Sequence, residues 1–273
     1  MKRALLVGIN NYKSDRIQDL NGCVNDVLNI RSLLKESFGF EDAGIHVVTD
    51  ERATAANIKD RLQQMIYKSQ DGDTLVFHFS GHGSQIRDRN GDELADGLDE
   101  LLCPYDMDWD RRESFITDDD LSEILAEGGK DLSNGQVFEI FLDCCHSGTG
   151  IRQMTGFNPS RQNRYTAPPI DILCRSMDVV ELPIERLFLR NQDLSDPILW
   201  SGCRANQTSA DAHIEGGYNG AFTWHLCDAI RKGATARGKL IQTLRSNLTN
   251  GGFGQVPQLE TRHEGKLTSR IFS

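Results

Sequence analysis

The chain has 273 residues, of which 38% are hydrophobic and 26% charged, and its formal net charge is -10. This composition fits one large α/β domain better than two small ones, and the negative charge argues against nucleic acid or an anionic membrane as the main partner. Lys2 and Arg3 lead straight into a short apolar run, and no stretch approaches the roughly 18 apolar residues of a membrane helix. We therefore expect a cytoplasmic protein with no membrane partner.

The first half of the chain alternates strand and helix patterns. Strands are predicted at 4–9, 45–49 and 74–79, and helices at 25–38 and after Thr54. Gly39 is placed to end the first helix, and the Thr54 hydroxyl is placed to cap the second. Alternation of this kind predicts a mostly parallel sheet with helices packed against it.

The second half contains two irregular stretches. Residues 82–100 form a long polar sequence, for which a loop is predicted, and residues 149–196 are basic with little periodicity, which favours a linker or an exposed excursion. The other predicted elements are a helix at 118–126, strands at 136–143, 198–202 and 258–261, and helices at 222–232 and 240–248.

Two of the predicted strands end in reactive side chains. The strand at 74–79 leads into S-G-H-G at 80–83, and the strand at 136–143 leads into C-C-H-S-G at 144–148. Ligands bind at the carboxyl ends of parallel strands, so the two segments would share a cleft if their strands are neighbours. A cysteine and a histidine in one cleft could form a dyad whose thiolate attacks a carbonyl carbon.

The cysteines themselves leave a second interpretation open. There are seven, an odd number that suits reduced thiols better than a disulfide framework. A thiolate metal site could be built from Cys144, Cys145, His146 and His82. Adjacent cysteines are poorly spaced to chelate one tetrahedral zinc ion, and no C-x-x-C pair is present, so the dyad is preferred.

The two motifs, S-G-H-G and D-C-C-H-S-G, resemble those of the caspase-like cysteine peptidases, most closely the metacaspases and their bacterial relatives. Five further segments fit that pattern in order: G-C-V-N-D at 22–26, D-G-L-D-E at 96–100, I-T-D-D-D-L at 116–121, S-G-C-R-A-N-Q-T-S-A-D-A at 201–212 and G-A-F-T at 220–223. The resemblance therefore covers most of the chain apart from the basic stretch.

The resemblance implies an α/β fold of the caspase type, with a central, mostly parallel sheet flanked by helices on both faces. It implies one peptidase domain over 1–273, in which 1–150 corresponds to a large subunit, 151–196 to a linker and 197–273 to a small subunit. Self-cleavage between residues 149 and 196 would separate the two parts. We expect a monomer.

The family pattern makes Cys145 the nucleophile and His82 its partner. The backbone N–H groups of Gly83 and Cys145 would stabilise the oxyanion. Cys144 stands where the pattern commonly has serine, and His146 directly follows the nucleophile, so both are expected to be structural. A caspase-fold interaction or regulatory module with little turnover is the alternative function, and the presence of both Cys145 and His82 counts against it.

The resemblance also implies a pocket for the P1 residue, the residue that precedes the cleaved bond. Its members would be Cys23, Asp26, Ser80 and Asp143. Two carboxylates would select arginine or lysine and repel aspartate, so the expected partners are proteins or peptides with a basic P1 residue. The spacing of Asp143 and Cys145 agrees, because residues i and i+2 of an extended chain share one face. Without the resemblance, Asp26 is explained equally well as an acid at a helix N-terminus.

Acidic residues raise the question of calcium, because hard oxygen ligands suit this ion. The resemblance gives Asp99, Asp118 and Asp119 as candidate ligands. Family members that depend on calcium have a further acid shortly after the nucleophile, whereas this chain has Ile151 and Arg152 in that region. We therefore expect no required cofactor and a weakened calcium site.

Overall fold

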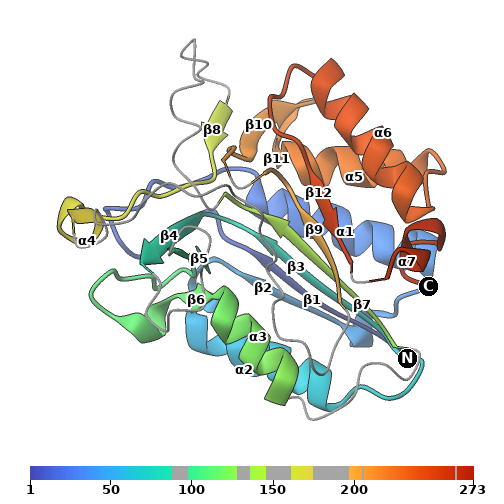
Figure 1. Ribbon diagram of the computed structural model, residues 1–273, viewed down its shortest axis with the longest axis horizontal. Helices are drawn as coiled ribbons and strands as arrows, with labels where there is room; N and C mark the ends of the chain where they lie inside the picture. The colour runs from blue at the N-terminus through green and yellow to red at the C-terminus, as the bar shows by residue number, and fades with distance from the viewer. Residues whose placement is uncertain (88–97, 128–135, 146–160, 175–196, 205, 262) are drawn as a thin grey trace.

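The computed structural model describes residues 1–87, 98–127, 136–145, 161–174, 197–204, 206–261 and 263–273. Its centre is a six-stranded sheet in the order β12-β9-β7-β3-β1-β2 (Figure 1). These strands are β1 (Lys2–Gly8), β2 (Ile45–Thr49), β3 (Thr74–Ser80), β7 (Val137–Asp143), β9 (Ile198–Ser201) and β12 (Gln258–Glu260). Neighbouring strands run parallel except at the edge, where β12 pairs antiparallel with β9.

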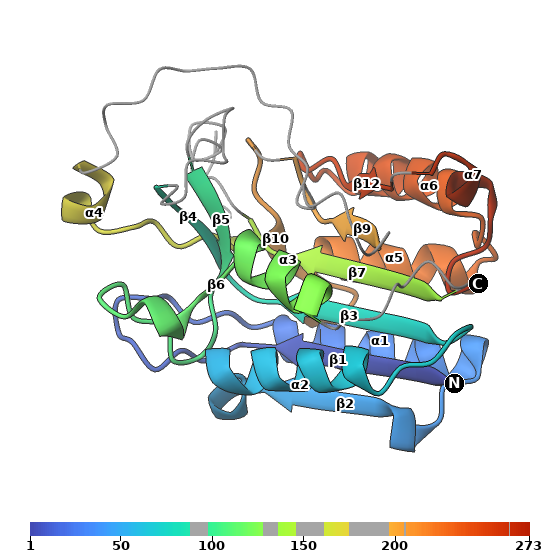
Figure 2. The same cartoon turned by 60° about the horizontal axis from the view of Figure 1, so that its bottom comes forward.

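Helices cover both faces of this sheet, as Figure 2 shows. On one face lie α1 (Cys23–Phe38), α5 (Ala221–Arg231) and α6 (Arg237–Asn250), and on the other lie α2 (Ala55–Tyr67) and α3 (Asp118–Glu127). A separate buried apolar cluster lies on each face, because the strands are apolar on both sides. The short helix α7 (Gly265–Thr268) contacts α6 near the C-terminus. This architecture confirms the predicted fold class.

Two of the predicted helix boundaries rest on capping residues, and both are observed. The Thr54 hydroxyl accepts a hydrogen bond from the Asn57 N–H at 3.3 Å and caps α2. Gly39 ends α1 with φ of 66°, a left-handed conformation in which glycine carries no Cβ penalty. Within the described residues, no helix is long and apolar enough to span a membrane.

The predicted loop at 82–100 is wrong at both of its ends. Strand β4 (Gly83–Arg87) pairs antiparallel with β5 (Leu98–Leu102), and β6 (Ile116–Thr117) pairs with β5 on its other side. Residues 88–97 lie outside the described part. The apolar side chains that hold these short strands, among them Ile86 and Leu101, are too few to produce a visible alternation in a polar sequence.

The basic stretch also differs from expectation where it is described, at residues 161–174. Strand β8 (Arg161–Asn163) is the edge of a three-stranded sheet with β10 (Ala210–Ile214) and β11 (Gly217–Gly220), and α4 (Ile170–Cys174) follows it. Arg164 directly after β8 has no exposed surface. The prediction that this stretch is exposed is therefore wrong at Arg164, whose side chain lies among buried carboxylates.

Candidate active site

The two strands that carry the candidate dyad are neighbours. Strands β3 and β7 run parallel with their last residues, Ser80 and Asp143, directly paired. His82 and Cys145 each follow two residues later, so both leave the sheet at the same edge. Both are buried, with exposed fractions of 2% and 0%. The expected neighbourhood of the two strands is confirmed.

The imidazole of His82 is held in a defined orientation. Its Nε2 lies 2.7 Å from the carbonyl oxygen of Gln18, which can only accept, so Nε2 carries the proton and Nδ1 keeps its lone pair. The backbone N–H of His82 donates to the Tyr12 hydroxyl at 2.7 Å, and the two rings pack with centroids 5.2 Å apart. Burial lowers the pKa of His82 to about 4, against the opposing effect of the Gln18 carbonyl. The ring is therefore neutral at pH 7, with Nδ1 available to accept a proton.

The Cys145 thiol contacts the backbone of Ser209. Its Sγ accepts from the Ser209 N–H at 2.6 Å and lies 3.4 Å from the Ser209 carbonyl oxygen, to which the thiol donates. The neighbouring Cys144 is 1% exposed, and burial raises the pKa of its thiol well above the ordinary value. Such a thiol stays protonated and unreactive, as a structural cysteine would. His146 lies outside the described residues.

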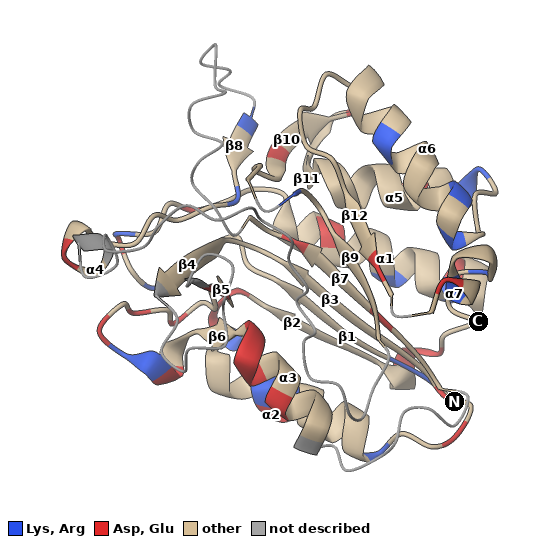
Figure 3. Ribbon diagram, in the orientation of Figure 1, with Lys and Arg blue, Asp and Glu red and all other residues tan. Residues whose placement is uncertain are grey.

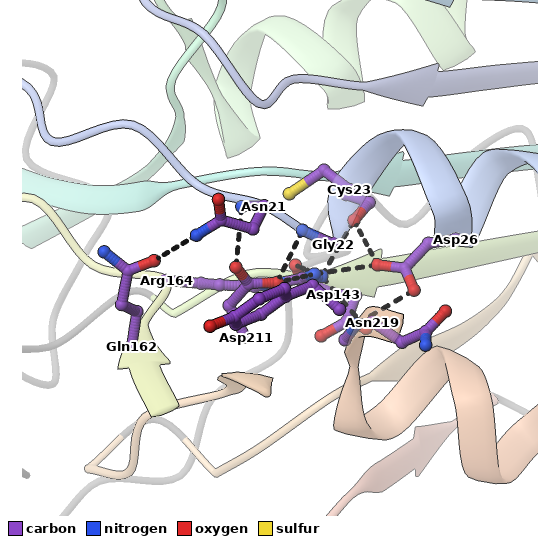
Figure 4. Close-up of polar contacts among 12 residues, drawn as sticks. Asn21, Gly22, Cys23, Asp26, Asp143, Gln162, Arg164, Asp211 and Asn219 are labelled. Atoms are coloured by element: carbon purple, nitrogen blue, oxygen red, sulfur yellow. Dashed lines mark hydrogen bonds and ion pairs between the residues drawn. The ribbon is translucent and has the colours of Figure 1, made fainter. Parts of the chain in front are cut away.

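Beside these groups the structure has a pocket of three buried carboxylates, which encloses the guanidinium of Arg164 (Figure 4). One nitrogen, Nη2, donates to Asp26 Oδ2 at 2.8 Å and to Asp211 Oδ1 at 2.9 Å. The other, Nη1, donates to the Ser80 hydroxyl at 2.8 Å and lies 3.2 Å from Asp143 Oδ2. Arg164 and the three acids have no exposed side-chain surface.

Each carboxylate is fixed by further hydrogen bonds. Asp143 accepts from the hydroxyls of Ser209 at 2.5 Å and Thr223 at 2.7 Å. Asp211 accepts from the backbone N–H groups of Asn21 at 2.8 Å and Gly22 at 3.0 Å. These bonds hold the acids in position for a cation, so little reorganisation is needed when one binds.

Burial and charge act against each other in this pocket. Burial raises the pKa of Asp26 to about 7, although the Arg164 guanidinium opposes this shift; the nearby Asp143 carboxylate adds to it. Burial alone would lower the pKa of Arg164, but the surrounding acids raise it well above the ordinary value. The Arg164 cation therefore favours the ionised form of Asp26.

The backbone of Arg164 is held as firmly as its side chain. Its carbonyl oxygen accepts from the backbone N–H of Gly83 at 3.0 Å and from that of Cys145 at 3.1 Å, and its own N–H donates to the Ser209 carbonyl at 3.0 Å. Just before it, β8 pairs antiparallel with β10, and just after it, the Thr166 N–H donates to the Gly83 carbonyl at 3.1 Å. One peptide carbonyl is thus fixed between two donors beside a thiol.

Comparisons with known proteins identify the family of the chain. A family model described as "Metacaspase, peptidase C14 domain" matches residues 2–153. Metacaspase-1A of Aspergillus niger is 30% identical over 295 residues, covering 96% of this chain and 70% of the relative. Metacaspase-1 of Botryotinia fuckeliana is 31% identical over 294 residues, covering 96% of this chain and 68% of the relative. The chain belongs to the metacaspase family.

Solved structures show the same fold for this metacaspase. The crystal structure of a protein from Geobacter sulfurreducens matches with a TM-score of 0.68 and 23% identity, covering 100% of this chain and 98% of the other. The crystal structure of caspase-1 from Spodoptera frugiperda matches with a TM-score of 0.59 and 16% identity, covering 95% and 85%. Metacaspases are a family of cysteine peptidases, so protein substrates are implied for this member.

The acidic pocket contains the predicted residues and others besides. Asp26, Ser80 and Asp143 contact the Arg164 guanidinium. Cys23 is fully buried nearby: burial raises the pKa of its thiol, and the Arg164 charge opposes this rise. Asp211, the third acid, is not among the pocket residues expected from the sequence. Its position was visible within the segment 201–212, but no spacing rule connects it to Asp26 and Asp143.

The residues proposed for calcium do not form a complete site in the part of the chain that is described. Asp99 and Asp118 are 4% and 9% exposed, and Asp119 lies with Asp118 in the first turn of α3, whose amino end is red in Figure 3. Among the described residues there is no group of three or more His, Cys, Asp or Glu side chains that could hold a metal ion. Ile151 and Arg152 lie outside these residues, and calcium dependence stays a prediction.

Proposed function

We propose that this metacaspase is an endopeptidase that cleaves after arginine or lysine, with Cys145 as nucleophile and His82 as general acid and base. The observation that carries the proposal is the position of Arg164. Its guanidinium fills the pocket of Asp26, Asp143 and Asp211, and its carbonyl oxygen accepts from two backbone N–H groups. A P1 residue needs both contacts: a side-chain pocket for selection and an oxyanion site for catalysis.

We further propose that the first substrate is the chain's own Arg164–Tyr165 bond. This bond lies within the region 149–196, where self-cleavage is expected from the sequence. Pairing of β8 with β10 supplies the extended conformation that peptidases bind, and it holds residues 161–163 as the P4 to P2 residues. Strand β9 follows the bond in sequence and pairs with β7, which precedes it, so the two products would stay associated in one sheet.

The reaction would proceed through a thioester. His82 Nδ1 takes the proton of the Cys145 thiol, and the thiolate attacks the P1 carbonyl carbon. The negative charge that develops on the carbonyl oxygen is stabilised by the N–H groups of Gly83 and Cys145. The carbon–nitrogen bond breaks, and the imidazolium gives its proton to the departing amine. Water, deprotonated by His82, then cleaves the thioester and releases the P1 carboxylate and the free thiol.

Arginine should be the better of the two P1 residues. The guanidinium donates from Nη1 and Nη2 to groups on different sides of the pocket. A lysine ammonium is a single point donor and cannot reach all of these acceptors together. Aspartate at P1 would add a fourth negative charge to a buried pocket, so we expect no measurable cleavage after it.

Peptide reporters that differ only in P1 test the proposal, in the presence and absence of calcium. We expect cleavage after arginine, slower cleavage after lysine and none after aspartate. The matched variants are Cys145→Ala, which should lose activity, and Cys144→Ala, which should keep it. Equal cleavage after arginine and aspartate would refute the pocket assignment. A wild-type chain that cleaves none of the reporters would favour the alternative of an interaction module.

A further inference from the structure

The side chain of Arg161, three residues before Arg164, has a binding site of its own. Its guanidinium lies over the ring of Phe253 at 4.2 Å from the ring centroid. Its Nη1 donates to the Gly252 carbonyl at 2.7 Å, and its Nη2 donates to the Gly251 carbonyl at 3.2 Å. One planar cation therefore contacts an aromatic face and two carbonyl oxygens at the same time.

The partners of Arg161 come from the end of α6. Gly251 is the C-cap of this helix, and Gly252 follows with φ of 72°, a left-handed conformation that suits glycine. Phe253 is the next residue after this turn. The C-terminus of a helix carries a partial negative charge, which favours a cation there. The Phe253 ring is supported from another direction by the His225 ring, with centroids 5.9 Å apart. The site is thus part of the folded body of the protein and does not belong to β8.

We propose that Phe253 and the carbonyls of Gly251 and Gly252 form an S4 subsite that selects arginine at P4, so that preferred substrates contain Arg-x-x-Arg. The inference rests on the proposed function, in which β8 occupies the substrate site. Arg161 is paired with Ala212 on β10, and this register places it at P4 when Arg164 is P1.

The chemistry of the subsite distinguishes arginine from other residues. A guanidinium stacks flat on an aromatic ring and donates from two nitrogens in one plane. A lysine ammonium can lie over the ring face and donate to one carbonyl, but it cannot reproduce both hydrogen bonds and the flat stacking. Alanine loses all of these contacts, and glutamate would meet carbonyl oxygens with a like partial charge. We expect the order arginine, lysine, alanine and glutamate.

The test compares acetyl-Arg-Gln-Asn-Arg and acetyl-Ala-Gln-Asn-Arg coumarin amides as substrates of the wild-type protein. Because the arginine contacts are charge-assisted and partly exposed, we expect kcat/KM to favour P4 arginine by about tenfold. In Phe253→Ala this preference should fall below about threefold, since the stacking face is lost. Tyr67→Ala removes an aromatic side chain that is 73% exposed at the far end of α2, and it should keep the full preference. Equal cleavage of both substrates by the wild-type protein would overturn the subsite.

A binding measurement separates failure of the subsite from failure of the proposed function. Calorimetry would use the triple variant Cys145→Ala, Arg161→Ala and Arg164→Ala, in which the chain's own basic side chains no longer compete. The acetyl-Arg-Gln-Asn-Arg amide should bind about tenfold more tightly than its P4 alanine analogue. Selective binding by the triple variant, together with no cleavage of either coumarin amide by the wild-type protein, would contradict the peptidase function and keep the subsite. Cleavage without P4 selectivity, or equal or absent binding of the two amides, would contradict the subsite.

Discussion

Arg164 and Cys145 are joined by a hydrogen bond of 3.1 Å from the backbone N–H of Cys145 to the carbonyl oxygen of Arg164. The same oxygen accepts from Gly83, and the Arg164 side chain fills the acidic pocket. In the proposed function, the segment around Arg164 lies as a substrate would lie and blocks the pocket for other peptides. Activity on external substrates would then require release of this segment, which cleavage after Arg164 would permit.

Replacement of Arg164 tests what its charge contributes to the uncut chain. Arg164→Ala leaves three buried carboxylates without a cation, which should lower the free energy of unfolding by about 3–5 kcal/mol, as for other broken buried ion pairs. Urea unfolding of the Cys145→Ala protein with and without this substitution measures the difference. Arg164→Lys keeps a charge and should lose less than Arg164→Ala. Equal stability of all three proteins would show that the pocket does not need a cation.

Gly220 forms a wall of the acidic pocket, and its substitution should block it. A Cβ at this position would collide with the Asp143 and Asp26 carboxylates and the Arg164 guanidinium. Its φ of -66° is open to alanine, so the effect would be steric. We expect Gly220→Ala to lower kcat/KM for an Arg-P1 reporter at least about a hundredfold, the scale for a misplaced substrate.

A glycine on the same strand provides the control for that variant. A Cβ on Gly217 would meet its nearest neighbour at an ordinary van der Waals distance of 3.8 Å. Gly217→Ala should therefore cleave the reporter as the wild-type protein does. If both variants were equally active, Gly220 would not border the P1 site.

Asp211 should contribute to P1 selection as strongly as the two acids that sequence motifs indicate. Asp211→Asn keeps the shape of the side chain but removes the charge that pairs with Arg164 at 2.9 Å. Loss of one charge-assisted bond should lower kcat/KM for arginine by about 10- to 100-fold, equivalent to about 1.5–3 kcal/mol. Asp42→Asn, in which the acid is 60% exposed, is the control and should change little. Unchanged kinetics in Asp211→Asn would remove this residue from the pocket.

The pocket should make P1 binding depend on pH. Asp26 must be ionised to pair with a basic P1 residue, and burial raises its pKa to about 7 even with the Arg164 guanidinium beside it. When Arg164 leaves the pocket, loss of this cation raises the pKa further. The acid is therefore protonated at neutral and lower pH, so kcat/KM for an Arg-P1 reporter should rise as the pH is raised through 7, by about tenfold per unit on the acid side. Asp26→Asn should have lower activity, and its kcat/KM should not show this rise with pH. The control is the rate at which iodoacetamide, a small neutral reagent, alkylates Cys145, because this rate depends on the thiol and His82 but not on P1 binding. If the alkylation rate rose with pH in the same way as kcat/KM, the pH dependence would not come from Asp26.

The sequence predicts the sheet, most of its helices and the carboxyl-end location of His82 and Cys145, because these depend on strong local periodicity and on the geometry of parallel strands. Strand β8 could not be predicted in the same way. Its residues are Arg, Gln and Asn, which carry no strand pattern, and it forms because β10 offers backbone partners. The burial of Arg164 depends on acids from three distant parts of the chain, at 26, 143 and 211. The resemblance places Asp26 and Asp143 in one pocket, but no sequence pattern adds Asp211 or a buried arginine to it.

The most direct measurement is the intact mass of the purified wild-type protein beside that of Cys145→Ala, after incubation at pH 8 with and without calcium. We expect the wild-type chain to be cut between Arg164 and Tyr165, giving fragments 1–164 and 165–273 that remain together under native conditions. Cys145→Ala should stay at the mass of the whole chain. Cleavage of the Cys145→Ala protein at this bond, or an active wild-type enzyme cut only at other bonds, would contradict this expectation.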